Sequence, residues 1–304
     1  MPKIISLLPS ATEIVCALGF ESAMVGRSHE CDYPPTITCL PVLTEPKFDP
    51  HGSSAELDQR VKRILREALS VYRVDPEKLR ALAPDVIVTQ SQCEVCAVSM
   101  REVEEAVAQW TGARPRIVSL APYGLSDVFA DMQRVADALE ASARGVALTD
   151  DLRERMATIK TRACQADSRP RLAIIEWIEP LMTAGNWMPE LVAMAGAVNL
   201  FGVAGEHSAR MNFIELASAD PDVIMIAPCG FNMDRTAEEL RMLQQQPQWP
   251  RLRAVRDGRI FLADGNQYFN RPGPRIVESL EILAQIVHPE LFGQGHEGGG
   301  FRRV

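Results

Sequence analysis

Short apolar runs alternate with amphipathic segments along most of the chain. Ile4–Leu8 is apolar enough to be a buried strand, and Ala11–Leu18 follows it with helical periodicity and a helix stop at Gly19. Further strands of the same kind are predicted over Asp85–Thr89, Arg116–Leu120, Leu172–Glu176, Asp222–Ala227 and Arg259–Ala263. Buried strands separated by helices are typical of parallel sheets. We therefore predict an α/β fold.

A long amphipathic segment divides the chain. Leu148, Leu152, Met156 and Ile159 recur at helical spacing within Ala141–Gln165, opposite a charged face. A helix of that length spans about 37 Å, which is too long for a crossover inside one lobe. We predict two Rossmann-like α/β lobes with parallel sheets, joined by this one long helix. The predicted boundaries are 1–140 for the N-terminal lobe, 141–166 for the helix, 167–288 for the C-terminal lobe and 289–304 for a flexible, Gly-rich tail.

The two predicted lobes share a local pattern. Leu79–Val88 and Leu216–Met225 both contain a helix that ends at Pro-Asp and a buried strand directly after it. Because this connection is common in α/β proteins, the echo is equally compatible with a repeated unit and with two independent uses of one solution.

Charge and the first residues narrow the class of protein. The 304 residues include 32 Lys+Arg and 40 Asp+Glu, a formal net charge of −8. An acidic chain is a poor general binder of nucleic acid or of an anionic membrane surface. No segment approaches the ~20 consecutive apolar residues of a membrane span. The first residues lack the uninterrupted apolar run of a secretory signal, so we expect a cytoplasmic protein, or a periplasmic one if a leader was removed.

Aromatic residues gather in the loops that follow the predicted strands. Open α/β sheets bind ligands beyond the carboxyl ends of their strands. The aromatic residues of these loops are Tyr33, Trp177, Trp187, Phe231 and Tyr268. Flat apolar walls favour a large planar ligand, although rings near strand ends also serve simply to cover a core. We favour the ligand because only 6% of the chain is aromatic.

Four of the seven cysteines fall in the same loops. Cys93 and Cys96 have the spacing that lets two thiolates bind one metal ion, and the His29-Glu30-Cys31 run together with Cys229 adds further donors. Thiolates suit zinc or an iron–sulfur cluster. The candidate metal ligands are therefore His29, Cys31, Cys93, Cys96 and Cys229. The alternative is that these cysteines only pack, since free cysteine is often buried.

Several motifs together resemble one known family. The run Ile4–Glu13 resembles the first strand and helix of cobalamin- and siderophore-type substrate-binding proteins of ABC importers, the class III proteins with a helical backbone. The resemblance continues through Pro84–Val88, Gly185–Leu191, Asp257–Phe261 and Arg271–Arg275, and it covers about residues 3–287. BtuF-like cobalamin-binding proteins are the most similar subgroup.

This resemblance implies two lobes joined by one long helix, with the ligand bound between them. It implies that the residues facing a corrinoid or similar metal chelate are Pro9, Ser10, Tyr33, Trp177, Trp187, Tyr268 and Arg271. It also implies an ABC importer as partner. The chain departs from the family in its first residues and in the cysteines of its strand-end loops.

Three functions remain open. The first is a binding protein for a corrinoid or related metal-containing ligand, with Arg271 pairing an anionic group and one of His29, Cys31, Cys93 or Cys229 at an axial position of the metal. The second is a cysteine-bound transition metal, such as zinc, or an iron–sulfur cluster. The third is a thiol-dependent corrinoid-processing enzyme. We rank the enzyme last because no complete set of nucleophile, base and orienting group is visible.

Overall fold

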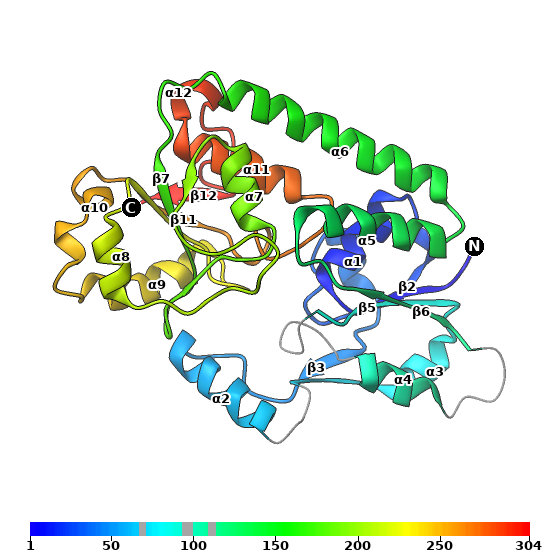
Figure 1. Cartoon of the computed structure of the whole chain (residues 1–304). Coiled ribbons are helices and arrows are strands. Elements are labelled where there is room, and N and C mark those ends of the chain that lie inside the picture. Colours follow the sequence, from blue (N-terminus) through cyan, green and yellow to red (C-terminus); the bar gives the residue numbers. More distant parts are fainter. Residues whose placement is uncertain (67–70, 93–99, 109–113) are drawn as a thin grey trace. The chain divides into compact units, whose positions relative to one another are not determined.

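The computed structural model describes residues 1–66, 71–92, 100–108 and 114–304, and it divides into two compact units. The first, here the N-lobe, comprises Met1–Gly52, Glu56–Pro122 and Ser126–Asp151. The second, here the C-lobe, comprises Ser53–Ala55, Tyr123–Leu125 and Leu152–Val304. Each unit contains a largely parallel sheet with helices packed against it (Figure 1). The predicted α/β fold class is confirmed.

The N-lobe sheet has four parallel strands in the order β2-β1-β5-β6. They are β1 (Ile4–Ser6), β2 (Met24–Arg27), β5 (Val86–Gln90) and β6 (Arg116–Leu120). The chain runs outward from β1 to β2 and then returns to β5 on the other side of β1. The strand order therefore reverses between β1 and β5, which makes this pair the switch point of the sheet.

Helices cover both faces of the N-lobe sheet (Figure 1). One side carries α1 (Pro9–Ala17) and α5 (Leu125–Ala138), and the other carries α3 (Pro76–Leu82) and α4 (Met100–Ala108). On the second side, Ile5 and Ile87 pack with Leu79 of α3 and Val103 of α4. The remaining elements are η1 (Glu21–Ala23), η2 (Pro35–Cys39), the antiparallel pair β3 (Thr44–Pro46) and β4 (Tyr72–Val74), and α2 (Ser54–Arg66), whose first residues belong to the C-lobe.

The C-lobe sheet repeats the same plan with antiparallel additions at its edges. Its order is β12-β11-β10-β7-β8, with β9 also paired to β7. The parallel strands are β7 (Arg171–Trp177), β9 (Val198–Asn199), β10 (Val223–Ile226) and β11 (Ile260–Ala263), and the antiparallel ones are β8 (Met182–Thr183) and β12 (Phe301–Arg303). Strand order reverses between β7 and β10, so this pair is the second switch point.

The helices of the C-lobe enclose a larger core. On one face, Ile175 of β7 and Ile224 of β10 pack with Leu216 and Leu240, which belong to α8 (Phe213–Ala219) and α9 (Met233–Gln244). The same core includes residues of η3 (Trp249–Arg251) and α10 (Arg253–Arg256). Two other helices, α7 (Met188–Met194) and α11 (Ile276–Val287), pack against each other.

The long helix predicted over 141–166 is α6 (Ser142–Ala163), and its residues fall in both units (Figure 1). Leu152, Met156 and Ile159 are buried, as their spacing predicts. After the C-lobe helices come α12 (Pro289–Phe292) and β12, which pairs with β11. The prediction of a flexible tail did not anticipate these two elements.

The echoed Pro-Asp sequences form the same structure in both lobes. The residues after α3 and α8, Ala83 and Asp220, have φ angles of 47° and 42°. In the N-lobe, the Asp85 carboxylate accepts from the Lys3 amide at 2.7 Å, and the Asp85 amide donates to the Lys3 carbonyl at 2.8 Å.

The C-lobe repeats this exchange at the first residue of β7. The Asp222 carboxylate accepts from the Arg171 amide at 2.8 Å, and the Asp222 amide donates to the Arg171 carbonyl at 2.9 Å. We call these two reciprocal pairs the strand-start clamps. Each ties the start of the first strand at a switch point to the start of its partner strand.

Candidate ligand-binding surfaces

The two switch points locate one candidate surface in each lobe, because open sheets bind ligands at the carboxyl ends of the strands there. The N-edge consists of Pro9 and Ser10 after β1 and residues 28–33 after β2. The C-edge consists of Trp177 at the end of β7, residues 227–231 after β10 and residues 264–271 after β11. Cys93 and Cys96, which follow β5, lie outside the described residues.

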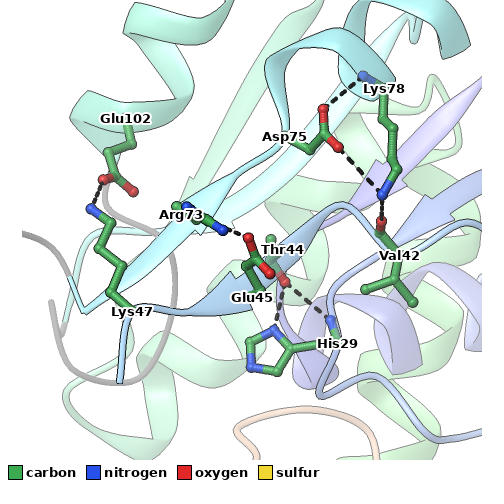
Figure 2. Close-up of polar contacts among 9 residues, drawn as sticks. All are labelled: His29, Val42, Thr44, Glu45, Lys47, Arg73, Asp75, Lys78 and Glu102. Atoms are coloured by element: carbon green, nitrogen blue, oxygen red, sulfur yellow. Dashed lines mark hydrogen bonds and ion pairs between the residues drawn. The ribbon is translucent and has the colours of Figure 1, made fainter. Parts of the chain in front are cut away.

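At the N-edge, the hydroxyl of Thr44 holds His29 in place. Thr44 Oγ1 accepts from the His29 amide at 3.0 Å and lies 2.7 Å from His29 Nδ1 (Figure 2). The same hydroxyl donates to Ser28 Oγ at 3.1 Å. Thr44 is buried and is the first residue of β3, where its position is fixed by pairing with Val74 of β4. The His29 ring is thus oriented by the β3–β4 pair.

The surroundings of His29 favour its neutral form. Burial lowers the pKa of His29 below its usual 6.5, and the Arg27 guanidinium lowers it further, against an opposing effect of Glu45. The Tyr72 ring lies 5.2 Å from the imidazole, centroid to centroid. Tyr72 also donates its hydroxyl to Glu30 Oε1 at 3.0 Å. His29 therefore presents an uncharged imidazole at neutral pH.

Cys31 is a core residue of the N-lobe. Its exposed fraction is 1%, and its Sγ lies 3.0 Å from the Thr12 hydroxyl, which also contacts Ser6 Oγ at 2.9 Å. Its carbonyl accepts from the Arg27 guanidinium at 3.0 Å. These contacts fix Cys31 inside the lobe.

The other N-edge residues differ in exposure. Tyr33 is 41% exposed, and Ser10 is buried at the start of α1. Pro9 is half-buried and is the first residue of α1, where its missing amide proton costs no hydrogen bond.

The C-edge is aromatic and cationic. The ring centroids of Trp177 and Phe231 lie 5.3 Å apart, and the guanidinium carbon of Arg235 lies 3.7 Å from the Phe231 centroid. Phe231 is 1% exposed, whereas Trp177 is only partly buried, with its indole N–H bonded to the Glu179 carbonyl at 3.0 Å. Part of the Trp177 side chain therefore stays exposed, and the ring lies against Phe231, which Arg235 contacts in turn.

The sequence did not point to Arg235. Its amide donates to the Asn232 side chain at 2.9 Å, in the N-cap of α9, which places it one helical turn after Phe231. The available signal was its spacing of four residues from Phe231 at a helix start.

Trp187 is part of the C-lobe interior. It is 6% exposed, and its indole N–H donates to the Phe269 carbonyl at 3.1 Å. Phe269 itself has a φ of 39°, a conformation that few side chains adopt. The bond from Trp187 ties α7 to the loop of residues 264–271.

The same loop arranges the remaining predicted residues of the C-edge. Asp264 Oδ1 accepts from the amides of Asn266 and Gln267 at 3.0 and 2.9 Å. Arg271 is buried and donates to Asn266 Oδ1 at 3.3 Å. Tyr268 is partly buried, and the Arg275 guanidinium carbon lies 5.3 Å from its ring centroid.

The donors predicted for a metal cluster do not form one in the described part of the chain. Cys31 is buried in the N-lobe, and Cys229 is an exposed residue of the C-lobe. Over residues 1–66, 71–92, 100–108 and 114–304, no three His, Cys, Asp or Glu side chains are grouped to hold a metal ion. The predicted zinc site or iron–sulfur cluster therefore has no support.

A hollow of about 740 Å³ lies elsewhere on the N-lobe. Side chains of both charges from α3 and α4, among them Arg80 and Glu105, line it. None of its lining residues belongs to the N-edge.

A sequence profile of the periplasmic binding protein family matches residues 4–266. The chain belongs to this family. The predicted resemblance to substrate-binding proteins of ABC importers is thereby confirmed. As a family member the chain is a ligand-binding protein, which confirms the coarser part of the predicted function.

Relatives and solved structures agree with this membership. An ABC transporter substrate-binding lipoprotein of Bacillus subtilis is 21% identical over 95% of this chain and 81% of its own length. A vitamin B12-binding protein of Vibrio cholerae is 22% identical over 92% and 86%. A periplasmic heme-binding protein of Pseudomonas aeruginosa has the same fold, with a TM-score of 0.70 and 23% identity over 96% of this chain and 94% of that one.

The predicted cytoplasmic location is wrong, because the family is one of periplasmic binding proteins. The prediction rested on the first residues, and these form β1 and the start of α1. They are part of the N-lobe core and carry no information on location. In the ranges that the structure describes, no helix is both long and apolar enough to cross a membrane.

Proposed function

We propose that this chain binds a corrinoid, or another planar tetrapyrrole with a central metal ion, as the cargo of an ABC importer. The likeness to a vitamin B12-binding protein over 92% of the chain carries the proposal. The C-edge supports it, because a partly exposed indole ring suits contact with a flat macrocycle. Both observations favour the class of ligand that the sequence predicts.

Each part of the C-edge has a role in this proposal. Trp177 contributes apolar area, at roughly 25 cal/mol for each Å² removed from water. Arg235 and Arg271 provide positive charge for the phosphate of a corrinoid or the carboxylates of a heme. Phe231 is covered already and serves to hold the Trp177 ring in place.

Equilibrium titration with cyanocobalamin and with hemin tests the proposal. We expect Trp177→Ala to weaken binding of the cargo about 10- to 50-fold, since loss of about 1.4 kcal/mol corresponds to tenfold in affinity. Trp249→Phe is the matched control. Trp249 packs in the C-lobe core beside α10, whose Ala254 amide bonds to Pro221 at the opposite, amino-terminal end of β10.

The outcomes separate the ligands. Binding of cyanocobalamin that weakens in Trp177→Ala and not in Trp249→Phe supports a corrinoid. Binding of hemin alone assigns the heme as cargo. Absence of binding to both compounds overturns the proposal.

A further inference from the structure

The hydrogen bonds around Thr44 fix which nitrogen of His29 is enclosed and which is open. Thr44 Oγ1 accepts from the His29 amide at 3.0 Å and lies 2.7 Å from His29 Nδ1 and 3.1 Å from Ser28 Oγ. When Nε2 of a neutral imidazole binds a metal ion, the ring carries its proton on Nδ1. Thr44 Oγ1 is placed to accept that proton in a hydrogen bond.

The Nε2 atom of His29 is accessible to a ligand. In the described part of the chain no hydrogen bond is made to His29 Nε2, and Nε2 is not among the enclosed polar atoms that lack a partner. Figure 2 shows the ring turned so that Nε2 points away from Thr44. A neutral imidazole that is held at Nδ1 and open at Nε2, just beyond the carboxyl end of β2, has the geometry of a metal ligand.

The support behind the ring is rigid. The Leu43 amide donates to the Arg27 carbonyl at 2.9 Å, and the Asp75 amide donates to the Leu43 carbonyl at 2.8 Å. These bonds fix Thr44 between β2 and α3. Metal-binding histidines are oriented in this way by a hydrogen bond to their second nitrogen.

We propose that His29 Nε2 binds the metal ion at the centre of the cargo, with Thr44 as the positioning residue. The inference rests on the proposed function, since it assumes a tetrapyrrole with a metal ion. Imidazole nitrogen suits both cobalt and iron. The step is a ligand exchange in which Nε2 replaces a water molecule on the metal, and no electron or proton is transferred.

Two cobinamides separate this inference from the proposed function. Diaquacobinamide has exchangeable axial water, whereas dicyanocobinamide, kept in excess cyanide, has both axial positions blocked. Binding of dicyanocobinamide depends on the macrocycle surface alone. For a heme cargo, hemin and metal-free protoporphyrin form the corresponding pair.

With wild-type protein we expect diaquacobinamide or hemin to show the visible absorption shift of imidazole coordination. His29→Ala removes the shift and weakens binding of that compound at least tenfold, and added imidazole restores the shift. Binding of the blocked or metal-free compound stays unchanged, which also shows that the variant is folded. Thr44→Val weakens the coordination signature, and Thr44→Ser retains it.

An identical spectrum in wild type and His29→Ala, with the blocked or metal-free compound still bound, overturns the role of His29 and leaves the proposed function standing. Failure of all four compounds to bind overturns the proposed function, and the inference with it.

Discussion

The N-edge and the C-edge occupy equivalent places in two sheets of the same plan, yet their chemistry differs. At the N-edge, hydroxyl groups hold one imidazole in a single orientation. At the C-edge, the partly buried Trp177 lies against the buried Phe231, and the guanidinium of Arg235 lies over the Phe231 ring. Topology thus decides where a binding surface lies, whereas the loop residues decide what it recognises. In the functions proposed above, the N-edge binds a single atom and the C-edge binds a flat face.

The largest expected effect on stability distinguishes Trp187 from Trp177, two tryptophans that the sequence assigns to the same ligand surface. Trp187 is buried and bonded to the Phe269 carbonyl, so Trp187→Ala should lower the free energy of unfolding by about 3–5 kcal/mol. Trp177→Ala should lower it far less, because that ring is only partly buried. Urea unfolding of both variants measures the difference, with Trp187→Phe as the control that keeps most of the ring volume. Equal losses would show that both rings belong to the core.

The strand-start clamps provide a comparison of intermediate size. Asp222→Ala should lower the free energy of unfolding by about 1–3 kcal/mol at pH 7, and Asp85→Ala by less. The reason is that Asp222 also forms an ion pair with Arg253, at 2.7 Å. Unfolding in urea again provides the measurement. A greater loss for Asp85→Ala would contradict the assignment of the extra ion pair.

The Asp222 clamp also predicts a pH dependence. Burial acts to raise the pKa of Asp222, and the Arg171 amide and Arg253 guanidinium outweigh it, so the pKa lies below 3.8. A carboxylate with a lowered pKa stabilises the folded state fully above its unfolded pKa and loses this effect as the pH falls through its folded pKa. Wild type and Asp222→Ala should therefore differ most above about pH 4 and converge below it.

The smallest effect concerns cysteine reactivity in the two lobes. Burial, with smaller contributions from Glu21, Glu13 and Cys31, raises the pKa of Cys16 to about 12. Alkylation at pH 8 should therefore leave Cys16 and the buried Cys31 unmodified and should label the exposed Cys229.

Mass spectrometry of individual peptides reads each site separately. Bound cargo should protect Cys229 and leave labelling of the exposed Cys39 and Cys164 unchanged. Labelling of Cys31 in the folded protein would contradict its place in the N-lobe core.

The central strands could be predicted because their residues carry enough local information. The predicted Asp85–Thr89 and Asp222–Ala227 correspond to β5 and β10, which are buried along their whole length. The β3–β4 pair could not be found in this way. Its short strands contain charged residues and a proline, and its pairing joins segments that are 28 residues apart at Glu45 and Arg73.

The same limit applies to the candidate site. Trp177 ends the apolar strand β7, and Phe231 lies in the short loop after β10, so their place near a strand end can be predicted from the sequence. Thr44 acts on a histidine 15 residues earlier in the chain, through a contact that only tertiary structure creates. Cys31 is a different case. A cysteine close to a histidine in the sequence is equally compatible with a metal ligand and with a core residue, so its burial could not be predicted.

The strand-start clamps lie at the amino-terminal ends of the strands, opposite the two edges described above. Strand register is therefore secured by backbone and carboxylate groups that take no part in recognition. Substitutions in the strand-end loops can accumulate without shifting the sheet beneath them. Strand register and ligand recognition therefore depend on different residues, so the residues that contact the ligand can change while the sheet stays the same.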